Sequence, residues 1–372
     1  MIKIPVRLLP RERAYPILVT SLDDLGAQLK KNRIKNKEAM VFTSPRIGGF
    51  YFDQVKRSLQ NADFSRIEKH EIPDGEINKN SAEYNLCLTA LVKKFPNPGS
   101  TPLVVNLGGG VIGDLCGFVA ATYRRGLPYI QVPTTLLGFV DCGVGGKVGI
   151  NFKVGSLEIK NLVGTYYQPK LVLADIQVLK TLDKRELRSG LAEVIKYGVV
   201  CDRVLFKFLE NKFNVGSILA LEPKALMHVF ARCYKIKAGL VVKDEKDSKG
   251  IRIVLNFGHT IGHALETASG HTLTHGEAIS VGMMGAIRLA VHLKDCRVDI
   301  LERVQAVLIQ AGLPVDAKDQ RISLKKVMEI IRYDKKSEHH ALRFVFPRTM
   351  GRHVVREIKD LNLVQTIIKD LI

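Results

Sequence analysis

The stretch TPLVVNLGGGVIGDLCGF, residues 101–118, predicts the fold of the N-terminal part of this chain. An apolar run is followed at once by glycines and then by apolar residues at helical spacing. Gly108, Gly110 and Gly113 satisfy the G-x-G-x-x-G pattern, in which N–H groups at a helix N-terminus approach a pyrophosphate. The acidic ribose ligand that usually lies about 20 residues further on is absent, because 128–136 reads PYIQVPTTL. The glycines therefore predict either a variant dinucleotide site or only tight packing of a helix on a strand.

Further apolar segments on both sides of this stretch extend the same pattern. The runs EAMVFTS (38–44), LPYIQVP (127–133) and PKLVLAD (169–175) are typical of buried strands and alternate with helical segments. Such alternation predicts βαβ units with a parallel sheet. After about residue 180, helical spacing dominates, as in 184–200, 224–242, 276–293 and 301–311. We expect an α/β protein with a Rossmann-like parallel-sheet domain (residues 1–180) and a mostly α-helical domain (181–372), with the boundary near Thr181.

The composition is that of a soluble globular protein, with 46% hydrophobic and 25% charged residues in 372. No apolar run approaches the roughly 18 residues that a membrane span needs. The N-terminal sequence MIKIPVRLLPRERAYP lacks the apolar core of a signal peptide, so we expect a cytoplasmic protein. Six cysteines are present without a CxxC pair, and Cys116 and Cys233 are expected to be buried free thiols.

The net charge of +19 calls for an explanation. Nucleic-acid binding, an anionic substrate and a basic solvated surface are three candidates. The basic residues are spread along the chain, and no helix-turn-helix, zinc-finger or RNA-binding pattern is recognisable. We therefore expect a basic surface with a few basic residues in an anion site, and no nucleic-acid or membrane partner.

The stretch LNFGHTIGHALE, residues 255–266, places His259 and His263 four positions apart in a predicted helix. Residues at this spacing lie on one helical face, so the two imidazoles could bind one metal ion. The catalytic glutamate of the zinc-protease pattern HExxH is missing. A further histidine, His275, follows a predicted turn at Ser269–Gly270. Glu193 lies in a predicted helix, where a solvated carboxylate is the plainer interpretation.

Eight blocks of sequence together resemble the sugar-phosphate cyclase superfamily, and within it the 3-dehydroquinate synthase family most. In chain order they read GGGVIGD, ATYRRG, VPTTLL, VDCGVGGKVGIN, KNLVGTYYQP, RSGLAEVIKYG, LNFGHTIGHALE and HGEAISVGM. The resemblance implies an NAD-binding N-terminal domain and a C-terminal domain that binds a metal and a small anionic sugar phosphate. It also implies a homodimer.

The resemblance assigns the metal, zinc with cobalt as an alternative, to Glu193, His259 and His275. Three N/O ligands with one open position describe a catalytic rather than a structural zinc site. In this assignment His263 faces the substrate as a hydrogen-bonding or proton-relay group. A buried histidine with only a structural role is the alternative for His263.

The resemblance also assigns catalytic, substrate and cofactor residues. The catalytic set is His263, Lys147, Lys196 and Asn256. The substrate set is Arg125, Asp141, Lys147, Asn161, Lys196, Lys237, Arg252, Asn256, His263 and a lysine of DKK, either Lys335 or Lys336. The NAD set is Asp74, Gly75, Glu76, Lys79, Gly109, Gly110, Val111, Ile112, Gly113, Asp114, Thr134, Thr135, Asp141, Lys147, Lys160 and Thr181.

The implied reaction converts 3-deoxy-D-arabino-heptulosonate 7-phosphate to 3-dehydroquinate and phosphate, by transient oxidation, elimination, re-reduction and aldol closure. The sequence departs from the family pattern in the motif VDCGVGGKVGIN and in the segment FKVGSLEIKN, which is about four residues longer before Lys160. The stretch GFVD followed by Cys142 and Gly143, and GTYY at 164–167, favour cyclases that use sedoheptulose 7-phosphate, such as valiolone synthases. Lys237, Arg252 and Asn256 favour the dehydroquinate type. A metal-dependent polyol dehydrogenase of the glycerol dehydrogenase type is a further alternative. The last alternative is a non-catalytic protein that binds NAD or nucleic acid.

Overall fold

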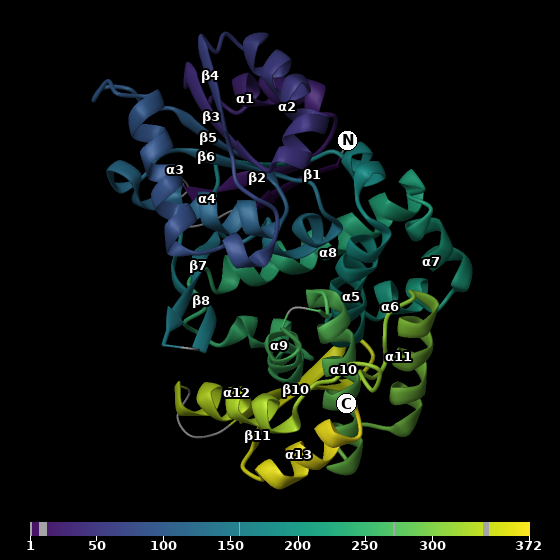
Figure 1. Ribbon diagram of the computed structural model, residues 1–372. Coiled ribbons are helices and arrows are strands. Elements are labelled where there is room, and N and C mark those ends of the chain that lie inside the picture. The colour runs from purple at the N-terminus through teal and green to yellow at the C-terminus, as the bar shows by residue number, and fades with distance from the viewer. Residues whose placement is uncertain (1, 7–12, 156, 271, 338–341) are drawn as a thin grey trace. The chain divides into compact units, whose positions relative to one another are not determined.

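A computed structural model describes residues 2–6, 13–155, 157–270, 272–337 and 342–372, without the side chains of 157, 158 and 333–337. The chain forms two compact units (Figure 1). The first comprises Met1–Leu182 and Lys237–Lys246, and the second comprises Asp183–Ile236 and Asp247–Ile372. Helix α8 (Pro223–Lys243) therefore begins in the second unit and ends in the first. The expected single boundary near Thr181 therefore leaves out the segment Lys237–Lys246, where the chain returns to the first unit.

The described part of the first unit contains a seven-stranded sheet in the order β1-β2-β9-β6-β5-β3-β4. Its strands are β1 (Ile2–Val6), β2 (Tyr15–Val19), β3 (Glu38–Thr43), β4 (Arg66–Glu71), β5 (Leu103–Gly108), β6 (Tyr129–Pro133) and β9 (Leu171–Ala174). Neighbouring strands are parallel except for β1, which pairs antiparallel with β2 at the edge. The α/β fold with a parallel sheet is confirmed, and the antiparallel edge strand makes the sheet mixed.

The direction of the connections reverses between the neighbouring strands β3 and β5. The chain leaves β3 through α2 (Pro45–Gln60) to the edge strand β4, and then returns to β5 through α3 (Ser81–Lys94). It leaves β5 through α4 (Gly110–Thr122) to β6, on the other side. Open α/β sheets bind ligands outside the carboxyl ends of the strands at such a reversal. The glycines at the end of β5 lie there.

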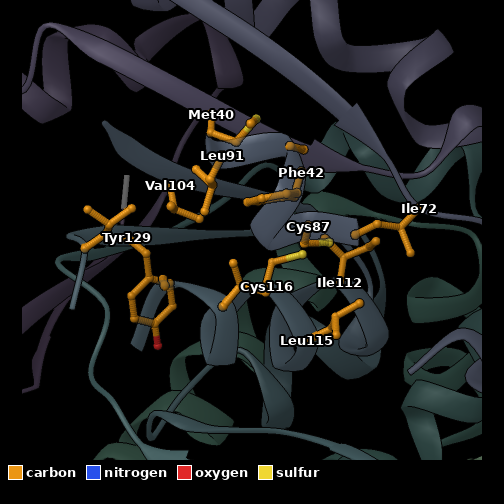
Figure 2. Close-up of a cluster of buried hydrophobic side chains, with 14 of the residues drawn as sticks. Met40, Phe42, Ile72, Cys87, Leu91, Val104, Ile112, Leu115, Cys116 and Tyr129 are labelled. Carbon is orange, nitrogen blue, oxygen red and sulfur yellow. The ribbon is translucent and has the colours of Figure 1, made fainter. Parts of the chain in front are cut away.

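A core of buried apolar side chains holds α3 and α4 on the sheet (Figure 2). Met40, Phe42 and Val104 come from the strands, and Leu91 comes from α3. Cys116 of α4 belongs to the same cluster and is a free thiol, as is the fully buried Cys233, so both expectations are confirmed. Helix α1 (Leu25–Lys31) also belongs to this unit.

An antiparallel hairpin packs on α4 and was not expected from the sequence. It consists of β7 (Lys147–Val154) and β8 (Leu157–Tyr166), with an irregularity between Ile150 and Phe152. The described residues of FKVGSLEIKN, 152–155 and 157–161, belong to the two strands of this hairpin and the turn that follows β7.

The second unit is mostly helical, as expected. Its helices besides α8 are α5 (Lys184–Val200), α6 (Arg203–Leu209), α7 (Lys212–Leu219), α9 (His259–Ala268), α10 (His275–His292), α11 (Val298–Gln310), α12 (Leu324–Ser337) and α13 (Leu361–Lys369). A hairpin of β10 (Leu342–Thr349) and β11 (Arg352–Ile358) accompanies them. Helix α10 is buried along most of its length and packs against α5, α9 and α11 (Figure 1). Among the described residues, no helix has both the length and the apolar character that membrane crossing requires.

Candidate active site

Three helices of the second unit bring Glu193, His259 and His275 together. Glu193 lies in the middle of α5, while His259 and His275 are the first residues of α9 and α10. The Nε2 atoms of His259 and His275 lie 3.6 Å and 3.5 Å from Glu193 Oε1. One ligand atom from each residue lies within 4.8 Å of the other two. Two imidazoles and one carboxylate in this arrangement fit a zinc-type ion with an open position.

Each histidine of this cluster has its other ring nitrogen held by an acceptor. His259 Nδ1 lies 3.1 Å from the carbonyl oxygen of Phe257, to which it donates. His275 Nδ1 lies 3.3 Å from Glu266 Oε2. A hydrogen bond at Nδ1 leaves Nε2 as the lone-pair donor, which is the arrangement found in metal-ligating histidines. The donor set therefore fits a bound divalent ion.

Glu266 was not among the residues predicted from the sequence. It follows His259 by seven residues and His263 by three, so all three lie along one side of α9. That spacing in HTIGHALE was the available signal. Because its partner His275 begins the next helix, the spacing alone does not show which side chain Glu266 contacts.

The start of α10 is fixed against α5 by polar contacts and close packing. Thr274 and Glu277 form a capping box, and the guanidinium of Arg185 on α5 donates to both oxygens of Glu277 at 2.7 and 2.6 Å. Gly276 N donates to Ser189 Oγ at 2.9 Å. A Cβ on Gly276 would lie 2.1 Å from the Ser189 carbonyl oxygen, so only glycine allows this approach. These contacts hold His275 beside Glu193.

The cluster contains a buried cation and two histidines with opposite pKa shifts. Lys196 is 1% exposed and forms an ion pair with Glu193 one helical turn away, so the solvated interpretation of Glu193 is wrong. Burial and the charge of Lys196 hold the pKa of His259 well below its usual value. Burial would lower the pKa of His275, but its bonds to Glu193 and Glu266 outweigh burial and raise it to about 9. A divalent cation would displace that proton.

His263 lies next to the cluster of Glu193, His259 and His275 without being part of it. Its ring centroid is 4.9 Å from that of His259 and 5.8 Å from that of His275. The side chain is exposed, which excludes the alternative of a buried structural histidine. The exposure leaves His263 accessible to a small ligand.

Two other predicted residues of the second unit lie in the turn that leads to α9. Arg252, 2% exposed, and Asn256, exposed, lie in the 3-10 turn Ile251–Asn256 that leads to His259. Asn256 is three residues before His259, which places it on the same short segment as a candidate metal ligand. The side chains of Lys335 and Lys336 lie outside the described residues.

In the first unit, helix α4 begins at the glycine turn after β5, and the glycines of this turn carry no side chain. The first helical bond runs from Gly113 N to the Gly109 carbonyl at 3.0 Å, so the helix itself does not use the preceding N–H groups of Gly110, Val111 and Ile112. A Cβ on Gly109 would lie 3.0 Å from the Thr135 side chain. Such a turn can accept a phosphate against its N–H groups.

Thr134 adds a polar atom to the residues around this turn. Its N–H donates to the carbonyl of Gly108 at 3.0 Å. Its Oγ1 is buried without a hydrogen-bond partner among the described residues. A buried hydroxyl without a partner is unfavourable and is consistent with a contact to a bound ligand. The turn and this hydroxyl together fit a dinucleotide.

A buried polar network connects several of the predicted cofactor residues. Lys79, 4% exposed, donates to Asp114 Oδ2 at 2.6 Å and to Asn161 Oδ1 at 2.5 Å. Asn151 of β7 donates to Glu76 Oε1 and accepts from Asn161 N, both at 2.9 Å. Burial would lower the pKa of Lys79, but Asp114 and Glu76 outweigh it and raise the pKa. The network brings three predicted NAD residues to the predicted substrate residue Asn161. Asn151 was missed from the sequence.

Another ion pair in the first unit joins Asp141 to Lys237. The two residues are 96 positions apart and meet because the chain returns to this unit at Lys237. Asp141 lies in the π-helical turn Gly138–Cys142. Both were predicted to contact substrate, and the structure places them together.

The other predicted residues of this unit lie on separate elements. Asp74 and Gly75 form the turn before Glu76, with Gly75 at a φ of 107°. Lys160 Nζ lies 3.9 Å from Glu76 Oε1. Lys147 begins β7, and Arg125 follows α4 with a φ of 64°. The hydroxyl of Thr181 is 2.6 Å from that of Tyr51 on α2.

Comparison with known proteins shows similarity over nearly the whole chain. Residues 69–189 match the family described as 3-dehydroquinate synthase N-terminal, and residues 190–337 match 3-dehydroquinate synthase C-terminal. The 3-dehydroquinate synthase of Geotalea uraniireducens (strain Rf4) is 42% identical over 354 residues, which cover 94% of this chain and 95% of that protein.

Two solved structures are also similar. The 2-epi-5-epi-valiolone synthase of Streptomyces hygroscopicus subsp. jinggangensis 5008, with NAD+ and Zn2+ bound, has 28% identity and a TM-score of 0.84, with 96% of both chains covered. A 2-deoxy-scyllo-inosose synthase complexed with carbaglucose-6-phosphate, NAD+ and Co2+ has 20% identity and a TM-score of 0.87 over 100% of both chains. The second likeness shows the fold alone.

Proposed function

The chain belongs to the 3-dehydroquinate synthase family, and we propose that it makes 3-dehydroquinate with the help of NAD and a divalent metal ion. Its substrate is 3-deoxy-D-arabino-heptulosonate 7-phosphate, and the second product is phosphate, which makes the enzyme a carbon–oxygen lyase. The observation that carries this proposal is the convergence of Glu193, His259 and His275, in a chain that is 42% identical to a 3-dehydroquinate synthase.

The assigned residues hold two groups in this proposal. Glu193, His259 and His275 bind the metal ion, zinc or cobalt, through one carboxylate oxygen and two Nε2 atoms. The glycine turn before α4, together with Thr134 and Lys79, binds NAD. When bound, NAD supplies a reversible hydride acceptor, and the metal ion supplies a Lewis acid for a substrate hydroxyl.

Basic side chains of the chain bind the substrate's phosphate and carboxylate. Lys196, Lys237 and Arg252 are at most 5% exposed, and charge interactions are stronger in such a low-dielectric environment. Guanidinium groups offer a fork to a carboxylate or phosphate, whereas an ammonium acts as a point charge. Their main effect is to hold a flexible substrate with two anionic ends in one orientation, which greatly raises the effective molarity of its reacting groups.

His263 donates or accepts a proton at the substrate in this proposal. Its exposed imidazole lies one helical turn from His259, so substrate oxygens at the metal's open position would be within its reach. Asn256, three residues before His259, supplies an amide hydrogen bond on the same segment.

A second candidate is a cyclase that acts on sedoheptulose 7-phosphate. The 28% identity to a valiolone synthase over 96% of both chains and the sequence VDCG at 140–143 favour it. A polyol dehydrogenase is disfavoured because the carboxylate of the cluster is Glu193, whereas an aspartate is usual in those enzymes.

A phosphate-release assay with both sugar phosphates tests the proposal. We expect phosphate from 3-deoxy-D-arabino-heptulosonate 7-phosphate without net NADH. Turnover of sedoheptulose 7-phosphate alone would establish the second candidate instead. NADH that accumulates with glycerol would indicate a dehydrogenase, and salt-sensitive DNA binding by an inactive, zinc-free protein would indicate a nucleic-acid-binding protein. The homodimer and the cytoplasmic location stay predictions.

A further inference from the structure

We propose that Glu266 is a positioning residue for the metal ligand His275. Its carboxylate sets which ring nitrogen of His275 faces the metal, and thereby how tightly the metal binds. The inference rests on the proposed function only in taking Glu193, His259 and His275 as the metal ligands.

The two ring nitrogens of His275 face two different carboxylates. Nε2 lies 3.5 Å from Glu193 Oε1, and Nδ1 lies 3.3 Å from Glu266 Oε2. A neutral imidazole carries its proton on one nitrogen and its lone pair on the other. When Nδ1–H donates to Glu266, the lone pair of Nε2 points to the Glu193 side. Glu266 therefore selects the tautomer that can bind a metal next to Glu193.

Glu266 is buried, with 6% exposure, in the last turn of α9. A buried carboxylate needs donors or cations around it, and the imidazole N–H of His275 is such a donor. A carboxylate acceptor also makes the ligating nitrogen more basic than a neutral acceptor does. Helix α9 thus supplies one metal ligand at its first residue and supports another, on α10, two turns later.

Direct ligation by Glu266 is the competing interpretation. Ligand atoms of His263, Glu266 and His275 also lie within 4.8 Å of one another. The two nitrogens of an imidazole diverge across the ring, so an ion on the Nε2 side of His275 is remote from its Nδ1 side. Glu266 therefore does not bind the ion held by Glu193 and His259.

The support at His259 is of a different kind. There Nδ1 donates to the backbone carbonyl of Phe257, two residues earlier in the chain. No side-chain substitution removes that acceptor. The contact between His275 and Glu266 is consequently the one histidine support among these ligands that mutation can remove cleanly.

The test compares zinc affinities by chelator competition. Glu266→Leu removes the acceptor and keeps the volume, and Glu266→Gln keeps an oxygen acceptor without the charge. Loss of such a support typically weakens metal binding about 10–100-fold, which we expect for Glu266→Leu, with a smaller loss for Glu266→Gln. Glu329→Gln, the same change at an exposed position of α12, is the control and should bind zinc like the wild type.

The cobalt(II) absorption spectrum distinguishes positioning from ligation. We expect Glu266→Gln to keep the wild-type band shape at saturating cobalt, whereas His275→Ala changes it. A spectrum of Glu266→Gln that resembles that of His275→Ala would overturn the positioning role. Unchanged zinc affinity in Glu266→Gln would also overturn it, and that variant suffices if Glu266→Leu does not fold. Wild-type protein that binds neither ion would refute the metal site itself, and the inference with it.

Discussion

Gly276 offers a test of how tightly the fold constrains the metal cluster. It follows the proposed ligand His275 at the start of α10 and lies against the backbone of Ser189 on α5, the helix that carries Glu193. In Gly276→Ala the new methyl carbon would lie 2.1 Å from the Ser189 carbonyl oxygen and 2.4 Å from its Cα. Ordinary contact begins at 3.4 Å, so the two helices must separate locally by about 1.3 Å. The clashing atoms are backbone, so no side-chain rotation relieves the overlap.

Such a shift is large for a metal site. Ligand distances are usually held within about 0.2 Å, so His275 would no longer bind together with Glu193 and His259. A zinc site with four ligands is worth about 10–16 kcal/mol, so the loss of one ligand costs roughly 3 kcal/mol. That corresponds to about 100-fold weaker binding, since about 1.4 kcal/mol is a factor of ten. Overpacking should also lower the free energy of unfolding by about 1–3 kcal/mol.

Zinc content after dialysis against a zinc buffer, followed by urea unfolding, measures both effects. Gly216→Ala on α7 is the matched control, because no atom lies within 4 Å of its added methyl carbon. There the same substitution should leave zinc unchanged and raise the free energy of unfolding by about 0.5–1 kcal/mol, the helix preference of alanine over glycine. If Gly276→Ala retained wild-type zinc affinity and stability, the rigid contact between α5 and α10 would be refuted.

Three further substitutions test the two histidines and one ion pair. His259→Ala should lose bound zinc, whereas His263→Ala should retain it and lose phosphate-release rate; equal zinc loss in both would contradict the role of His263. Asp202 is the N-cap of α6, and its carboxylate accepts two hydrogen bonds from the guanidinium of Arg232 at 2.6 and 2.7 Å. Burial would raise the pKa of Asp202, but its hydrogen bonds outweigh burial and hold the pKa below its usual value. Asp202→Asn should lower the free energy of unfolding by about 1–2 kcal/mol at neutral pH. The pKa of Asp202 is lower in the folded state than the value of about 4 expected in the unfolded chain. The stability difference between wild type and variant should therefore be present in full above the unfolded pKa and should disappear as the pH falls through the folded-state pKa. A difference that persisted at low pH would contradict this prediction.

Local pattern in the sequence determined the main elements of the fold. The apolar runs at 38–44, 101–108 and 127–133 became β3, β5 and β6, and the helical spacing at 184–200 became α5. These elements were predictable because the periods of strands and helices depend on residues only a few positions apart. The glycine turn after β5 was predictable for the same reason. The resemblance of the eight blocks added the proposed assignment of the metal ligands, which no periodicity contains.

Tertiary structure alone decided the contacts that complete the sites. Lys237 meets Asp141 across 96 positions, and Gly276 meets Ser189 across 87, because the chain returns and the helices pack closely. The four-residue spacing of His259 and His263 suggested that these two side chains could bind one metal ion. The fold instead brings Glu193 and His275 to His259, from two other helices, and places Glu266 behind His275. Helical spacing determines which side chains share a face, but the packing of α9 against α5 and α10 determines what that face meets.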